Sequence, residues 1–215
     1  TESLYATLIQ PAAMFISKFI EEDTNLPHAS YDLWEEKFLT TTYTTATVIR
    51  ALRRASSFAD QFGYPDDAVQ WMQVADSIES SLPLLYDPDR QAYRKGLLRL
   101  PDGNLQFDNT LDMSTLYGLT MFTKVKLNDP TIIHTVEAIE SNLVNKTIGG
   151  VVRYENDNYM KTSEDAQPNP WFVCTLWLAQ YYVQRQQPDK AKELIDWSLS
   201  HSLDSGILSE QVHPE

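Results

Sequence analysis

The chain has 215 residues, of which 42% are hydrophobic, enough for one domain with a sizeable core. Its formal net charge of −13 argues against a nucleic acid or an anionic membrane as partner, because both require clustered Lys and Arg. The single cysteine, Cys174, excludes a disulfide within the chain, and the four histidines are scattered. We therefore expect no cofactor and no metal site. The sequence does not indicate a cellular compartment.

Helical periodicity dominates the first part of the chain. Apolar residues recur close to a 3.6-residue spacing over 1–22, and 40–62 is a long, mostly apolar stretch with Thr and Ala. A third helix is predicted over 65–86, which opens with a proline. Between 92 and 107, two short strands flank a Pro-Asp-Gly-Asn sequence at 101–104, a strong signal for a β-hairpin.

Consecutive helices alternate in character along the chain. Helices that are apolar on most sides, as buried helices are, are predicted over 40–62, 112–125 and 170–186. Amphipathic helices are predicted over 66–86, 130–144 and 188–202. This alternation predicts an all-α fold, either an α/α toroid of inner and outer helices or a helical solenoid. Because no repeat of fixed period is visible, one domain with long loops is favoured.

Two connections stand out because they lack a helical pattern. Residues 145–169 form a long segment of aromatic and mixed charged composition. Structureless loops beyond about 12–15 residues in a compact domain are usually functional or disordered, and the aromatic content favours function here. The second connection, 203–215, contains the sequence Ser-Glu-Gln at 209–211.

Three carboxylates surround a tryptophan near residue 34. If 30–36 forms a helical turn, Asp32 and Glu36 share one face and Glu35 lies beside them. Carboxylates this close raise one another's pKa, and the wall of Trp34 adds desolvation, so that one carboxyl group could stay protonated and serve a leaving group. The alternative is structural: Asp32 and Glu35 also fit a helix N-cap box, and acidic first turns are favoured by the helix dipole.

The other candidate residues are weak signals when each is taken alone. Glu210 lies in a loop, where a glutamate is usually just solvated. Arg153 fits a surface or ion-paired position equally well. Asn169 could simply cap the helix that begins at Pro170 and Trp171.

Four blocks in sequence order carry more weight than any one of them. They are the Tyr-Asp-Leu-Trp-Glu-Glu sequence at 31–36, the segment from Gly150 through Arg-Tyr at 153–154 to Tyr159, the Asn-Pro-Trp-Phe-Val-Cys-Thr-Leu sequence at 169–176, and Leu-Ser-Glu-Gln at 208–211. Together they resemble the conserved blocks of glucoamylase-type inverting glycosidases, glycoside hydrolase family 15. That family also includes glucodextranases and some trehalases. The resemblance extends from about residue 30 to the end of the chain.

The resemblance implies a fold and a site. It implies an (α/α)6 toroid, with Glu35 as the general acid and Glu210 as the general base. Asp112, which opens an inner helix, is expected near the pocket. Inverting glycosidases need one carboxylic acid to protonate the leaving oxygen and one carboxylate to activate water on the opposite face. The same resemblance assigns to the sugar-binding pocket Trp34, Glu36, Arg153, Asp157, Tyr159 and Trp171.

The expected function is exo-acting hydrolysis that releases glucose from the non-reducing ends of an α-glucan oligosaccharide or polysaccharide. Glucodextranase and trehalase activity would use the same acid and base, so they remain alternatives. A non-catalytic carbohydrate-binding or regulatory toroid is a further alternative, although such a module would not need a separated acid and base. A helical-repeat scaffold would leave the Trp-Glu-Glu block and the 145–169 loop unexplained.

The resemblance also implies that residues 1–215 form only part of the toroid. The family's toroid has six helical hairpins, and residues 1–215 are expected to form a single partial catalytic domain that lacks the early hairpins and the last inner helix. We expect the rest of a parent chain to complete the toroid, and the isolated chain to have negligible hydrolase activity.

Overall fold

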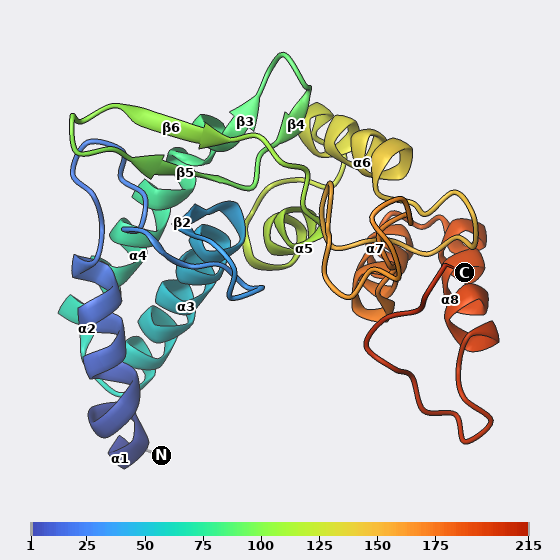
Figure 1. The fold of residues 1–215 in the computed structure, drawn as a ribbon. Coiled ribbons are helices and arrows are strands. Elements are labelled where there is room, and N and C mark those ends of the chain that lie inside the picture. The colour runs from blue at the N-terminus through green and yellow to red at the C-terminus, as the bar shows by residue number, and fades with distance from the viewer. Residues whose placement is uncertain (1, 215) are drawn as a thin grey trace.

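The protein is described here by a computed structural model, which covers residues 2–214. The helices form an open arc, and a small β-sheet lies along one edge of it (Figure 1). No helix within 2–214 is both long enough and apolar enough to cross a membrane.

The first helices match the sequence predictions closely in place but end earlier. The predicted helix over 1–22 stops at residue 18, where Phe19 leaves the helical conformation. The predicted helix over 65–86 stops at residue 80 and continues as a short 3-10 turn, Leu82–Leu85. The elements are α1 (Glu2–Leu4), a π-helical segment (Tyr5–Ile9), α2 (Gln10–Lys18), α3 (Thr42–Gln61) and α4 (Pro65–Ser80).

The second half contains the four further helices that the sequence predicted. Asp112 and Asp129 cap two of them, since each side chain accepts a hydrogen bond from the second backbone N–H beyond it. The 145–169 connection contains no helix, as predicted. The elements are α5 (Met113–Phe122), α6 (Pro130–Asn142), α7 (Phe172–Gln184) and α8 (Pro188–Ser200).

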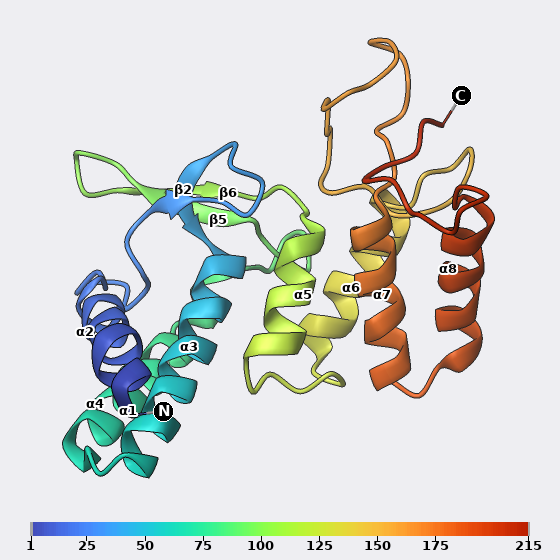
Figure 2. The ribbon, with the colours of Figure 1, turned by 90° about the horizontal axis from the view of Figure 1, so that it is seen from below.

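Inner and outer helices alternate as the sequence pattern predicted. Helix α5 packs between α3 and α7, while α4 and α8 pack behind α3 and α7 respectively. Gly118 allows the close approach of α5 to α3, because an added Cβ would lie 3.1 Å from the Cα of Tyr43. The N-terminal ends of α3, α5 and α7 lie on the same side of the molecule, where the long loops gather (Figure 2).

The sheet contains a hairpin that was predicted and one that was not. The predicted hairpin is β5 (Gly96–Arg99) with β6 (Leu105–Asp108). A second hairpin, β1 (Ser30–Tyr31) with β2 (Phe38–Thr41), pairs with β5 to give the antiparallel order β1-β2-β5-β6. Two further short strands, β3 (Tyr86–Asp87) and β4 (Ala92–Tyr93), pair separately.

The helical turn expected over 30–36 was therefore wrong. The backbone N–H of Asp32 donates to the carbonyl of Lys37 at 2.9 Å, which closes a loop between β1 and β2. Asp32 and Glu36 are four residues apart, but they do not share a helix face. Instead, the Asp32 side chain accepts a hydrogen bond from the Glu36 backbone N–H. Side chain to backbone bonds of this kind compete with helix formation.

Candidate active site

The turn over residues 32–37 carries Glu35. The Asp32 Oδ1 atom accepts hydrogen bonds from the backbone N–H groups of Glu36 at 2.8 Å and Lys37 at 3.2 Å. The Glu35 backbone N–H donates to the Asp32 carbonyl at 3.1 Å. Glu35 has a φ of 58°, a left-handed conformation that non-glycine residues adopt only where the surroundings hold them. Its side chain is exposed.

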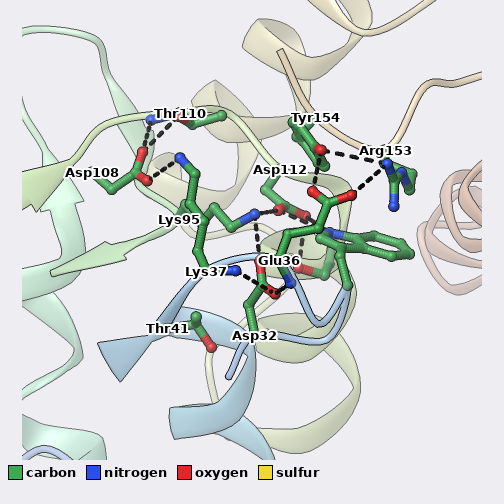
Figure 3. Close-up of polar contacts among 12 residues, drawn as sticks. Asp32, Glu36, Lys37, Thr41, Lys95, Asp108, Thr110, Asp112, Arg153 and Tyr154 are labelled. Carbon is green, nitrogen blue, oxygen red and sulfur yellow. Dashed lines mark hydrogen bonds and ion pairs between the residues drawn. The ribbon is translucent and has the colours of Figure 1, made fainter. Parts of the chain in front are cut away.

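A buried ion cluster lies beneath this turn. The Lys95 Nζ atom is 2.7 Å from Asp32 Oδ2 and 3.2 Å from Asp112 Oδ2, and each of the three side chains is at most 2% exposed. Figure 3 shows the Lys95 ammonium reaching between the two carboxylates. Burial alone would raise the pKa of Asp32, but Lys95 and the two backbone N–H groups outweigh it and lower that pKa. Burial alone would lower the pKa of Lys95, and the two carboxylates raise it.

Asp112 links this cluster to Trp34. The Trp34 indole N–H donates to Asp112 Oδ2 at 3.0 Å, and the Asp112 side chain also accepts from Ser114 at the start of α5. Asp112 is 1% exposed and lies behind Trp34. It therefore supports the pocket without lining it.

Arg153 is the centre of a second buried network. Its guanidinium donates to both oxygens of Asp157, at 2.7 and 2.8 Å, and to Glu36 at 3.0 Å. The Tyr154 hydroxyl also donates to Glu36. Burial alone would lower the pKa of the Arg153 guanidinium. The hydrogen bonds and the charge of Asp157 outweigh burial and raise this pKa above its ordinary value. Burial, followed by the bond to Glu36, raises the pKa of Tyr154.

Arg153 is also enclosed by aromatic rings. Its guanidinium carbon lies 4.6 Å from the ring centre of Trp171, 4.9 Å from that of Tyr159 and 5.2 Å from that of Trp34. Cation–π attraction stabilises a guanidinium at such distances. The aromatic walls and the carboxylates together fix the orientation of the donor fork.

The strand-like segment that carries Arg153 runs between the N-termini of α5 and α7. The Met113 N–H donates to the carbonyl of Arg153, and the Trp171 N–H donates to that of Val151, both at 2.8 Å. Gly150, with a φ of +72°, packs against the indole of Trp197 so closely that a Cβ would lie 2.4 Å from a ring carbon. A side chain at this position would clash with Trp197, so a glycine is needed for the 145–169 loop to pack against α8.

Glu210 reaches the same region by backbone pairing. The Phe172 N–H donates to the Glu210 carbonyl at 3.3 Å, and the Val212 N–H donates to the Pro170 carbonyl at 3.0 Å. The Asn169 amide donates to the Gln211 side chain at 3.0 Å. Asn169 is therefore not the helix cap that the sequence suggested: α7 begins at residue 172, so the capping position falls on Trp171.

These segments line an open cavity of about 1080 Å³. Of the eight predicted site residues, Asp157 lies behind Arg153, and the others line the cavity: Glu35, Glu210, Trp34, Glu36, Arg153, Tyr159 and Trp171. One face of α7 also lines the cavity and had been given no role, although its three- and four-residue spacing is visible in the sequence: Val173, Leu176, Trp177 and Gln180. Tyr154 stands in the second sequence block but was given no role there, and Lys95 was missed because no local pattern marks it.

The site offers carboxylates, a guanidinium and aromatic faces as its chemistry. Within residues 2–214, no group of three or more His, Cys, Asp or Glu side chains is arranged to hold a metal ion. Cys174 is buried, and burial raises the pKa of its thiol well above the ordinary value.

Curated proteins similar to this chain include a glycosyl hydrolase and a trehalase. The chain is 30% identical over 199 residues to an uncharacterized glycosyl hydrolase of Methanocaldococcus jannaschii, covering 86% of this chain and 30% of that protein. It is 26% identical over 188 residues to trehalase 2 of Sulfolobus acidocaldarius, again covering 86% and 30%. The chain thus spans about a third or less of the length of these relatives.

The structure resembles a bacterial glucoamylase solved in complex with acarbose, with a TM-score of 0.82 and 20% sequence identity. The likeness covers 99% of this chain and 34% of the glucoamylase. It confirms the predicted fold, part of an (α/α)6 toroid. The family model for glycosyl hydrolases family 15 matches residues 5–213. The chain therefore belongs to glycosyl hydrolases family 15, as the four sequence blocks implied.

Proposed function

We propose that this chain supplies the acid and the base of an inverting, exo-acting glycosidase that releases glucose from the non-reducing ends of α-glucans. The observation that carries the proposal is that Glu35 and Glu210 line one cavity with Arg153. They come from two loops that are far apart in sequence and lie on the side of the molecule where the inner helices α3, α5 and α7 begin (Figure 2). Family membership gives this pair its chemical meaning.

In this proposal, Glu35 is the general acid and Glu210 the general base. Glu35 protonates the glycosidic oxygen as the bond to the leaving sugar breaks. Glu210 removes a proton from the water that attacks the anomeric carbon from the opposite face, so the anomeric configuration inverts. Inverting glycosidases require a separation of about 6.5–9.5 Å between the two carboxyl groups to admit that water.

The remaining cavity residues suit a sugar ring. Asp157 and Glu36 hold the guanidinium of Arg153 in place through its Nε and Nη2 atoms, which leaves its Nη1 group to donate to sugar hydroxyls. The indoles of Trp34 and Trp171 supply flat apolar faces against which the CH groups of a sugar pack.

The substrate proposal draws on the named relatives. A glucoamylase with bound acarbose supports an α-glucan substrate, whereas trehalase 2 favours trehalose as the second candidate. Glucodextranase activity would use the same acid and base. Because the chain spans 30% of its curated relatives, we further propose that additional hairpins of a longer protein close the toroid around this cavity.

The test is a substrate panel of maltose, maltooligosaccharides, isomaltose and trehalose on the full-length protein, with the first-formed anomer read by NMR. Inversion predicts β-glucose as the first product. Glu35→Gln and Glu210→Gln should each lower kcat on the preferred natural glycoside about 10²–10⁴-fold. Glu193→Gln, an exposed glutamate on α8, is the matched control.

Three outcomes would contradict the proposal. An α-anomer as first product would exclude inversion. Near-normal turnover by Glu210→Gln would assign the base to another residue. Binding of glucans without any hydrolysis would favour the non-catalytic sugar-binding alternative.

A further inference from the structure

Lys95 is a buried cation that takes no part in lining the cavity. Its side chain is 2% exposed, and it lies between β4 and β5. We propose that Lys95 is a positioning residue that holds the acid-bearing 32–37 turn against the N-terminus of α5 and so aims Glu35 into the cavity. This inference rests on the proposed role of Glu35 as the acid.

The backbone of Lys95 is itself firmly fixed. Its N–H donates to the carbonyl of Thr110 at 3.0 Å, and its carbonyl accepts from the N–H of Thr42 at 2.9 Å. Residue 42 is the first of α3, and residue 110 lies just before α5. The ammonium therefore projects from a point that is anchored to the starts of two inner helices.

The first arm of the cluster reaches the residues that follow Glu35. Lys95 binds Asp32 Oδ2, while Asp32 Oδ1 holds the backbone N–H groups of Glu36 and Lys37. The Asp32 carboxylate thus links the Lys95 ammonium to the backbone of the turn, so the position of the ammonium fixes the position of the turn. Without its cation, a buried Asp32 carboxylate would favour the neutral form, which is a weaker acceptor for those two N–H groups.

The second arm reaches the residue that precedes Glu35. Asp112 Oδ2 lies 3.2 Å from Lys95 Nζ and 3.0 Å from the Trp34 indole nitrogen. Trp34 and Glu36 flank Glu35, so both neighbours of the acid are fixed through carboxylates that share one ammonium. This bracing accounts for the persistence of the left-handed backbone at Glu35.

The cluster also adjoins the sugar-binding side of the site. The Lys95 Nζ atom lies 4.4 Å from the ring centre of Tyr154, whose hydroxyl donates to Glu36. Nevertheless, Glu210 is held by α7 and not by this cluster. Loss of Lys95 should therefore damage the acid step far more than the base step.

Leaving-group chemistry separates these two steps. Hydrolysis of a maltooligosaccharide requires protonation of the departing sugar oxygen. Hydrolysis of α-glucosyl fluoride does not, because fluoride departs as an anion, while water still needs the base and ends up as the hydroxyl of β-glucose. A residue that positions the acid is therefore needed for hydrolysis of maltooligosaccharides and much less for hydrolysis of α-glucosyl fluoride.

The experiment compares both substrates in the full-length protein carrying Lys95→Met. We expect kcat on maltooligosaccharides to fall about 10²-fold, as for misplacement of a reacting group, and kcat on α-glucosyl fluoride to fall less than about fivefold. Lys37→Met is the matched control, because this exposed lysine lies on the same turn and should leave both rates unchanged. Equal losses on both substrates would show a merely structural role for Lys95 and overturn the proposal, as would no loss on either.

Further variants keep the outcomes distinguishable. If Lys95→Met does not fold, Lys95→Met combined with Asp112→Asn removes one buried negative charge with the cation, and the same substrate contrast decides. Glu35→Gln tests the proposed function separately. If it lowers kcat on maltooligosaccharides and on α-glucosyl fluoride by the same factor, Glu35 is not the general acid. In that event, hydrogen exchange at the Glu36 and Lys37 amides still tests Lys95, since faster exchange in Lys95→Met than in Lys37→Met supports the bracing and unchanged exchange overturns it.

Discussion

The two loops that carry the carboxylates are held in different ways. The turn of Glu35 is fixed from beneath by buried charges, through Asp32, Lys95 and Asp112. The 203–214 segment that carries Glu210 is mostly exposed, and backbone hydrogen bonds and a side-chain amide contact attach it to the start of α7 and the residues just before it.

This difference matches what each carboxyl group is proposed to do. An acid that must meet one oxygen of the leaving group gains from a rigid support, because proton transfer depends on geometry. A base that acts through a water molecule tolerates a lighter anchor. We call residues 32–37 the acid turn and residues 203–214 the base segment, after the proposed roles of Glu35 and Glu210. The contrast predicts that substitutions beneath the acid turn lower the free energy of unfolding more than substitutions along the base segment.

The largest expected effect is at Arg153, which joins the acid turn to the 145–169 loop. Arg153→Met would leave the buried Asp157 without its cation, and breaking a buried ion pair in this way costs about 3–5 kcal/mol. Chemical denaturation of the full-length protein measures the loss. Arg90→Met is the control, since the Arg90 pair with Glu155 is partly exposed and is expected to contribute about 0–1 kcal/mol. Equal losses from the two variants would contradict the contrast between buried and exposed pairs.

The sequence predicted the helices and the β5–β6 hairpin because their signals are local. Apolar spacing, prolines at helix starts and the Pro-Asp-Gly-Asn turn each act within a few residues. The β1–β2 hairpin escaped prediction because its strands are short and gain their support from β5, far along the chain. Propensity within 30–36 could not reveal that partner.

The candidate site shows the same division. The four sequence blocks named the residues around the cavity through family resemblance, and the roles given to Glu35 and Glu210 stay predictions. Lys95 went unnoticed because nothing in its neighbourhood indicates two carboxylate partners. Only the folded chain brings Asp32 and Asp112 to it. The pKa of Asp32 was misjudged for the same reason: the sequence predicted that nearby carboxylates raise it, whereas Lys95 and two backbone N–H groups lower it.

The next effect concerns the pH dependence of the acid turn. The pKa of Asp32 is lower in the folded protein than in an unfolded chain, so its ionised form stabilises the fold above the ordinary aspartate pKa of about 4. That contribution is lost as pH falls through the folded pKa. Asp32→Asn should therefore lower the free energy of unfolding by about 1–3 kcal/mol near pH 7, and the difference from the wild type should shrink below about pH 4. Urea unfolding across pH tests this, and a difference that is constant with pH would show that the charge is not involved.

A smaller effect is expected in the base segment. Gln211→Ala removes the acceptor of the Asn169 amide, but Asn169 keeps its bond to the Met160 carbonyl at 2.9 Å, and the backbone pairing remains. We expect a loss of about 0.5–1.5 kcal/mol. Hydrogen exchange at the Val212 amide should become faster, with the exposed His213→Ala as control. A loss as large as that of Arg153→Met would show that the base segment is braced as strongly as the acid turn.

The smallest effect is expected at Lys37, which lies on the same turn as Glu35 but faces solvent. Its ammonium is 2.6 Å from Asp108, and its side chain is 48% exposed. Water and salt screen such a pair, so it contributes about 0–1 kcal/mol. Lys37→Met keeps the backbone N–H that Asp32 binds, which is the contact that shapes the turn. Thermal unfolding at low and high salt should therefore separate Lys37→Met from the wild type by no more than about 1 kcal/mol. A loss above about 2 kcal/mol would mean that exposed charges hold the acid turn, and the buried cluster would then no longer explain why the two loops differ.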